Sequence, residues 1–132
     1  MNKHFDIKEQ LLISSGELYR TVDNIIIFNP SEGLNSHSIA QMEEMIAAVQ
    51  KLSNGDKLPY ITDINNAVKF SSEEKNKARE SLRIFKSAAF VTNASISRVI
   101  MSAFLLFHKN SPPLKVFKSI EEAKKWSLQN IK

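Results

Sequence analysis

The sequence contains no cysteine and only three glycines, and these shortages exclude several kinds of functional site. Without cysteine the chain forms neither a disulfide framework nor a thiolate zinc site, and it has no cysteine nucleophile. Its glycines make no GxGxxG, GxSxG or P-loop motif, so nucleotide binding through a standard glycine-rich loop is not expected. The three histidines lie far apart, at positions 4, 37 and 108, and none has a second metal ligand at i, i+4 spacing. We therefore expect neither a metal site nor a cofactor.

Long apolar segments are missing as well. The longest, from Val99 to Phe107, is interrupted by Ser102 and is much shorter than the roughly 20 residues that cross a bilayer. The first ten residues, MNKHFDIKEQ, are charged and lack the apolar core of a signal peptide. We therefore expect a cytoplasmic protein without a membrane span.

The composition is that of a soluble globular domain. The chain has 132 residues, 42% of them hydrophobic and 24% charged, which predicts one domain covering residues 1–132. The net charge of +4 comes entirely from residues 108–132, which carry six lysines and two glutamates, whereas residues 1–107 carry twelve basic and twelve acidic residues. Because these lysines are scattered among acids and are not interleaved with aromatic residues, we interpret them as a solvated helix face and expect no nucleic-acid partner.

The sequence pattern predicts an α/β fold with a mixed sheet. The beginning of the chain reads as an antiparallel meander, with strands at 4–14, 18–22 and 25–28 and turns at 14–16 and 23–24. Helices and strands then alternate, which favours parallel strands with right-handed crossovers. We predict helices at 39–52, 72–84 and 94–107, strands at 60–64, 88–91 and 114–117, and a final helix from 120.

Capping residues mark several of these helix ends. Ser36 or Ser38 is expected to cap the first helix, and Asn54-Gly55 to end it. Ser119 and Glu122 form a capping-box pattern before the final helix. The apolar side chains expected on the core face of that helix are Ile120, Ala123, Trp126 and Leu128.

Several phrases of the sequence resemble a known family. They are PYITDINN followed by a helix opened by serines, and KSAAFVTNASISRVIMSAFLLFHKNSPPLKVFKSIEEAKKW. In this order and spacing, over about residues 25–130, the chain resembles the small SpoIIAA-like proteins, relatives of the STAS domain of anti-sigma-factor antagonists. The resemblance implies a SpoIIAA-like mixed β-sheet flanked by about four helices. It also implies a role in protein interaction or ligand sensing rather than catalysis.

The serine pair at 71 and 72 has two interpretations. By the resemblance, Ser72 matches the phosphoacceptor serine of the antagonists, while Ser71 replaces their aspartate and an acidic residue replaces their glycine. An added phosphate would be repelled by Glu73 and Glu74. From the residues alone, the serines are helix N-caps, and the two glutamates complement the positive end of the helix dipole.

Asp63 and Arg98 are the charged candidates. Asp63 ends an apolar strand, where a carboxylate needs a hydrogen-bonding partner, so it either serves as a ligand or acid–base group or accepts hydrogen bonds from a loop that includes Asn65 and Asn66. No second carboxylate is identifiable beside it, which leaves a two-carboxylate mechanism without support. Arg98 either binds an anion or pairs with a nearby acid.

The predicted helix at 94–107 is apolar nearly all round, and such a helix is buried or meets a partner. One side of the helix carries a narrow polar strip, and Leu105 extends this strip with an apolar side chain. Phe104 and Phe107 lie on other sides of the helix. Three roles remain open: burial, a self-association or partner surface, and a wall of a pocket for an apolar ligand together with Phe90.

We therefore expect a non-enzymatic interaction or regulatory module of the STAS-like kind, acting on a protein partner or as a homodimer. The candidate switch or interaction residues are Asp63, Ser71, Ser72, Arg98, Phe104, Leu105 and Phe107. The alternative is a carrier or sensor of a small apolar or anionic ligand bound between the third helix and the sheet. An enzyme is a third interpretation, and it would require a second polar group to converge on Asp63.

Overall fold

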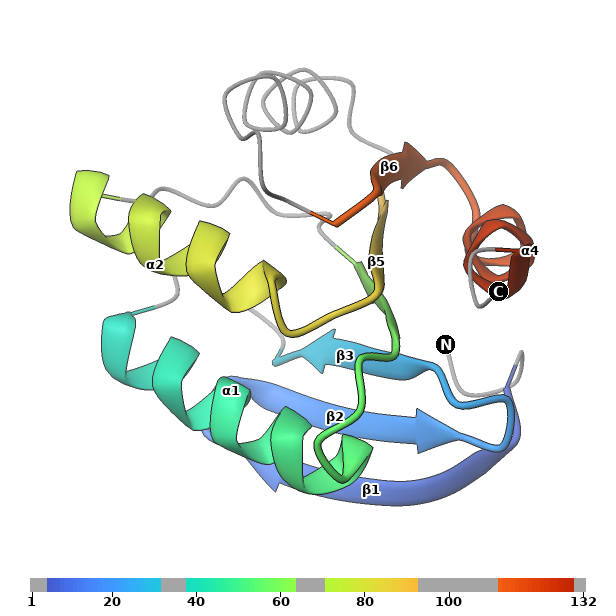
Figure 1. Cartoon of the computed structure of the whole chain (residues 1–132), viewed down its shortest axis with the longest axis horizontal. Coiled ribbons are helices and arrows are strands. Elements are labelled where there is room, and N and C mark those ends of the chain that lie inside the picture. The colour runs from blue at the N-terminus through green and yellow to red at the C-terminus, as the bar shows by residue number, and fades with distance from the viewer. Residues whose placement is uncertain (1–4, 32–37, 64–70, 93–111, 130–132) are drawn as a thin grey trace.

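The computed structural model describes residues 5–31, 38–63, 71–92 and 112–129. In these residues a six-stranded mixed sheet carries helices on both faces (Figure 1). The elements in chain order are β1 (Ile7–Ile13), β2 (Gly16–Thr21), β3 (Ile26–Pro30), α1 (Ile39–Ser53), β4 (Pro59–Asp63), α2 (Ser72–Leu82), β5 (Ser87–Val91), β6 (Leu114–Phe117) and α4 (Ile120–Gln129).

The strands lie in the sheet in their order along the chain, from β1 to β6. β1, β2 and β3 are antiparallel neighbours, and β3, β4, β5 and β6 are parallel neighbours. The antiparallel meander and the parallel strands that the sequence predicts are therefore both confirmed. Asn24, at a backbone φ of 63°, makes the tight turn between β2 and β3.

Gly16 is required where β2 begins, because β3 passes very close to it. A Cβ atom on Gly16 would lie 2.3 Å from the carbonyl oxygen of Asn29 and 2.8 Å from the Cα of Pro30. The same region is joined by a hydrogen bond of 2.9 Å from the Ser31 N–H to the carbonyl oxygen of Ser15. The tip of the β1–β2 hairpin is thus held against the end of β3.

Alternation along the strands gives each face of the sheet its own core. On the first face α1 and α2 lie side by side (Figure 1), over a cluster that includes Leu18, Phe28, Tyr60 and Phe90. On the second face α4 packs over β4, β5 and β6, and its cluster includes Ile61, Ala89, Phe117 and Ala123. Because side chains alternate with period two, neighbouring residues such as Tyr60 and Ile61 belong to different cores.

Small side chains form the contact between α4 and β5. Ala89 on the strand and Ala123 on the helix are fully buried in one cluster. Ser87 and Ser127 are also fully buried, and neither hydroxyl has a hydrogen-bond partner in the described part of the chain. The aromatic part of the contact is a tilted pair of the Phe117 and Trp126 rings, whose centroids lie 5.7 Å apart.

Three expectations about the helices need correction. Ile120, Ala123 and Trp126 contact the core as predicted, but Leu128 is 37% exposed and Ser127 takes its place. The helix predicted at 72–84 ends at Leu82, and residues 83–85 continue as turns. The described residues contain three helices rather than about four, and the helix predicted at 94–107 lies outside them.

Candidate functional site

The carboxyl ends of the four parallel strands define the candidate site. β3, β4, β5 and β6 run in one direction, so their last residues share one edge of the sheet, and the chain leaves β3 and β4 there to reach α1 and α2. In open α/β sheets ligands usually bind outside the carboxyl ends of the strands. Asp63 at the end of β4 and the serine pair at the start of α2 both lie at this edge.

At the start of α2, Ser71 is the N-cap and Ser72 is the first helical residue. The Glu74 N–H donates to the Ser71 Oγ at 3.1 Å, and the Ser71 N–H donates to the Glu74 Oε1 at 2.9 Å. This reciprocal pair is a complete capping box, which satisfies two backbone donors that the helix itself cannot pair. Of the two serines expected as caps, Ser71 therefore fills that role, and the Ser72 residue is exposed.

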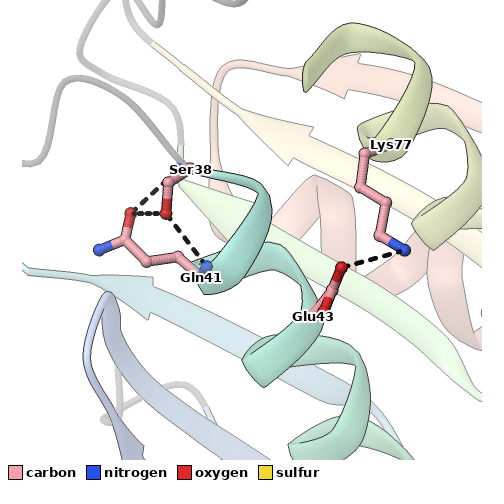
Figure 2. Close-up of polar contacts among 4 residues, drawn as sticks. All are labelled: Ser38, Gln41, Glu43 and Lys77. Atoms are coloured by element: carbon pink, nitrogen blue, oxygen red, sulfur yellow. Dashed lines mark hydrogen bonds and ion pairs between the residues drawn. The ribbon is translucent and has the colours of Figure 1, made fainter. Parts of the chain in front are cut away.

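The start of α1 has the same construction. The Gln41 N–H donates to the Ser38 Oγ at 3.1 Å, and the Ser38 N–H donates to the Gln41 Oε1 at 3.1 Å (Figure 2). Of the two serines proposed for this cap, Ser38 fills the role and Ser36 lies outside the described residues. Each helix thus supplies its own acceptors to its first turn, so neither start depends on an external anion for its order.

Asp63 is half-buried and lies opposite Val91 of β5. Because Ile61, two residues earlier, belongs to the core under α4, strand alternation turns Asp63 towards that face as well. Ser71 and Ser72 start a helix on the opposite face. The structure therefore places Asp63 and the serine pair at one edge of the sheet but on different faces. These residues do not converge on one site.

Tyr60 and Phe90 belong to the packed core behind this edge. The Tyr60 ring stacks on Phe85 with centroids 4.2 Å apart and meets Phe90 edge-on at 6.4 Å. Burial raises the pKa of the Tyr60 hydroxyl well above its ordinary value, while a hydrogen bond with Thr62 acts in the opposite direction. Thr62 in turn donates to the carbonyl oxygen of Phe28 at 3.2 Å. Phe90, expected as a pocket wall, is thus packed against another ring on this side.

An ion pair joins the two helices of the first face. The Lys77 Nζ lies 3.9 Å from the Glu43 Oε1 (Figure 2), and the two side chains are 27% and 62% exposed. A pair this exposed contributes at most about 1 kcal/mol. It therefore helps to align α1 with α2 but does not mark a functional centre.

The tip of the β1–β2 hairpin also lies at this edge, which no pattern in the sequence predicts. The Ser14 N–H donates to the Glu44 Oε1 of α1 at 3.1 Å, and its Oγ donates to the same oxygen. At the other end of the helix, the Arg20 guanidinium donates to the carbonyl oxygen of Leu52 at 2.7 Å. These bonds join residues about 30 positions apart in the sequence, so only the sheet order reveals them.

Four candidate residues, Arg98, Phe104, Leu105 and Phe107, lie outside the described residues. Within the described residues, no group of three or more His, Asp or Glu side chains could hold a metal ion. No helix among these same residues is long and apolar enough to cross a membrane.

A comparison with protein families finds a match to the domain of unknown function DUF7793, over residues 19–132. The chain belongs to the DUF7793 family. The match begins in β2 and includes the four parallel strands and α2, but not the tip of the β1–β2 hairpin. A search of curated proteins gives no match.

The fold of this DUF7793 protein is similar to that of a solved protein from Shewanella loihica PV-4. That protein is an uncharacterized member of the DUF3478 family with a SpoIIAA-like fold. The TM-score is 0.58 at 14% sequence identity, with 93% of this chain and 94% of the other covered. At this identity the similarity shows the fold alone, and the SpoIIAA-like fold expected from the sequence is confirmed.

Proposed function

We propose that this DUF7793 protein is a non-enzymatic interaction or regulatory module of the cytoplasm. Its recognition surface is the carboxyl edge of the parallel strands at the end of β4 and the start of α2. The crossing predicted at 64–72 connects these two elements along the chain, and its residues 64–70 lie outside the described residues. Its partner is another protein or a second copy of the chain. The predicted helix at 94–107 extends this surface if its apolar side chains meet a partner.

The observation that carries the proposal is the capping box of Ser71 and Glu74 beside the exposed Ser72. It holds the first turn of α2 in one conformation while Ser72 and Glu73 remain accessible. A rigid, exposed helix start binds a protein surface with little loss of conformational entropy. Asp63 and the serine pair lie on different faces of the sheet, which favours this role over chemistry on a bound substrate, because such chemistry needs converging groups.

The cap also favours recognition by contact over a phosphate switch at Ser72. A phosphate on Ser72 would adjoin Glu73 and Glu74, which already occupy the positive end of the helix dipole. The repulsion would oppose the modification that the antagonists use.

The experiment is affinity capture from source cells with two matched bulky substitutions. Ser72→Trp changes the candidate edge, and Lys57→Trp changes an exposed residue that precedes β4, at the opposite edge. We expect the wild type and Lys57→Trp to retain one common partner, and Ser72→Trp to lose it. Equal capture by both variants would contradict the proposed surface.

Self-association through the predicted helix at 94–107 is tested separately by light scattering of Leu105→Glu. If the wild type is a dimer and the mass of this variant is unchanged, that segment is not the dimer surface.

A further inference from the structure

The β1 strand forms one end of the sheet, and among the described strands it pairs only with β2. The outer side of such an edge strand presents backbone N–H and C=O groups that a further strand can pair with. The end of β1 is also anchored to the first face of the sheet and to α1. Leu11 and Ile13 pack against the core of the first face, and Ser14 is bonded to Glu44 of α1.

Only the first half of β1 carries features that prevent a further strand from pairing with its outer side. The register with β2 shifts between Ile7 and Glu9, so Lys8 is an extra residue, and both charged side chains of the strand, Lys8 and Glu9, lie there. Charges and bulges are the usual protection of an edge. Residues 10–14, QLLIS, are uncharged, and residues 10–13 pair with β2 in an uninterrupted register.

The alternation of the antiparallel ladder fixes which backbone groups face outward. Ile13 and Gly16 close a two-residue loop, and the closing pair of such a loop is a hydrogen-bonded pair. Pairs alternate along the ladder, so Gln10 and Leu12 direct their N–H and C=O groups away from β2. Leu12 is also 78% exposed, whereas Leu11 and Ile13 are half-buried.

From this geometry we propose that a second copy of the chain pairs with β1 in an antiparallel ladder centred on Leu12. This placement sets Leu12 opposite Leu12 of the second copy, Leu11 opposite Ile13, and Gln10 opposite Ser14. Both copies contribute the same outward groups, so the two leucines form a hydrogen-bonded pair and their exposed side chains contact each other on one face.

The alternative registers are poorer. In a symmetric antiparallel pair, side chains of opposing residues lie on the same face only if the two-fold axis passes through a residue. The axis can therefore move only by whole residues. An axis at Leu11 sets Glu9 opposite the half-buried Ile13. A centre at Gln10 sets Glu9 opposite Leu11 and brings the extra residue Lys8 into the ladder. A second copy is therefore favoured as the occupant because the uncharged segment is complementary to itself about Leu12. The other edge strand, β6, has only four residues, includes the exposed Lys115 and follows Pro112-Pro113.

This inference deepens the proposed function, because it names one partner and moves self-association from the 94–107 segment to β1. The chain has no cysteine, so a single introduced cysteine reports on the contact directly. The Cα atoms of a hydrogen-bonded antiparallel pair lie about 5.5 Å apart, which is within the range of a disulfide. The matched control is Val22, which is also apolar and 61% exposed but lies after the end of β2.

The test combines oxidative cross-linking with sedimentation equilibrium on the full chain. We expect Leu12→Cys to form a covalent dimer about tenfold faster than Val22→Cys, because pairing raises the local concentration of the thiol. We also expect a concentration-dependent dimer of the wild type, of Val22→Lys and of Leu105→Glu, and a monomer of Leu12→Lys. The urea midpoint of Leu12→Lys should equal that of the wild type at low concentrations, where the wild type is also a monomer.

Equal cross-linking rates of the two cysteine variants, or a wild type that is monomeric at every concentration, would overturn the β1 contact. If Leu105→Glu alone dissociates the dimer, the β1 contact is wrong while the proposed interaction function stands. Loss of partner capture by Ser72→Trp is independent of all these outcomes, so the two proposals fail separately.

Discussion

Substitution of Gly16 by alanine is expected to destabilise the fold, because the added methyl group has no space. Its Cβ would lie 2.3 Å from the Asn29 carbonyl oxygen, 2.8 Å from the Pro30 Cα and 3.0 Å from the Phe28 Cε1. Two of these atoms belong to the backbone of β3, which is paired on both sides and cannot move alone. Overpacking of this kind costs roughly 1–3 kcal/mol, and backbone contacts put the cost near the upper limit.

The unfolded chain reduces this loss slightly. Alanine restricts the unfolded state more than glycine does, which offsets about 0.4–1 kcal/mol. A net loss of about 2 kcal/mol is then expected. With an unfolding entropy of about 2.1 cal/mol/K per residue, a loss of this size lowers the melting temperature of a chain of 132 residues by roughly 7 °C.

The assay is urea unfolding followed by circular dichroism, with Gly55→Ala as the control. Gly55 has a φ of 85° and nothing within 4 Å of its Cβ position, so its substitution costs only the left-handed backbone conformation, about 1 kcal/mol before the same offset. A free energy of unfolding of Gly16→Ala within about 0.5 kcal/mol of the wild-type value would refute the close approach of β3 to Gly16.

Three further predictions concern single side chains. Ser71→Ala should lower the free energy of unfolding by about 1 kcal/mol while Ser72→Ala is nearly neutral, because only Ser71 caps α2; equal losses in urea unfolding would show that the cap is misassigned. Ser127→Ala should be neutral or stabilising by up to about 1 kcal/mol, since it removes a buried hydroxyl without a partner in the described residues, and a clear loss of stability would contradict this. The free energy of unfolding should fall as the pH rises above 10.0, the ordinary pKa of tyrosine, because the unfolded chain releases the Tyr60 proton that the buried side chain retains. Tyr60→Phe should flatten this decline of stability with pH. The tyrosinate absorbance of the wild type measures the ionisation.

Local sequence signals predicted the helix starts well. Ser38 with Gln41, and Ser71 with Glu74, follow the capping-box spacing, and each box forms as a contact within four residues. Contacts between residues this close in the chain can be predicted from the sequence alone. The same signals could not decide between Ser71 and Ser72, because both precede an acidic turn.

Hydrophobicity misled the prediction on the final helix. At 100° per residue, Ser127 lies within about 20° of Ile120 on the helical wheel, whereas Leu128 lies about 80° away. Helical periodicity alone therefore favours Ser127 as the core residue. Hydrophobicity favours Leu128, because the serine side chain carries a polar hydroxyl. The structure shows why a small residue is buried there: Ala123 and Ser127 face a strand whose own residues, Ser87 and Ala89, are small.

The neighbours of each strand in the sheet were beyond the sequence signals. That Gly16 touches β3, and that β1 ends the sheet, depends on pairings between distant segments, which a one-dimensional pattern does not contain. The adjacent leucines at 11 and 12 are a partial signal. In a strand with alternating faces, one of two neighbouring leucines must leave the core face, and it is Leu12 that is exposed.

The central claim is that the edge at the start of α2 recognises a protein. Photo-cross-linking in source cells tests it most directly, with a photoreactive residue in place of Ser72 or, as the control, of Lys57 at the opposite edge. The proposed function predicts one discrete cross-linked product at position 72 that position 57 does not form. The same products at both positions, or none at position 72, would contradict it.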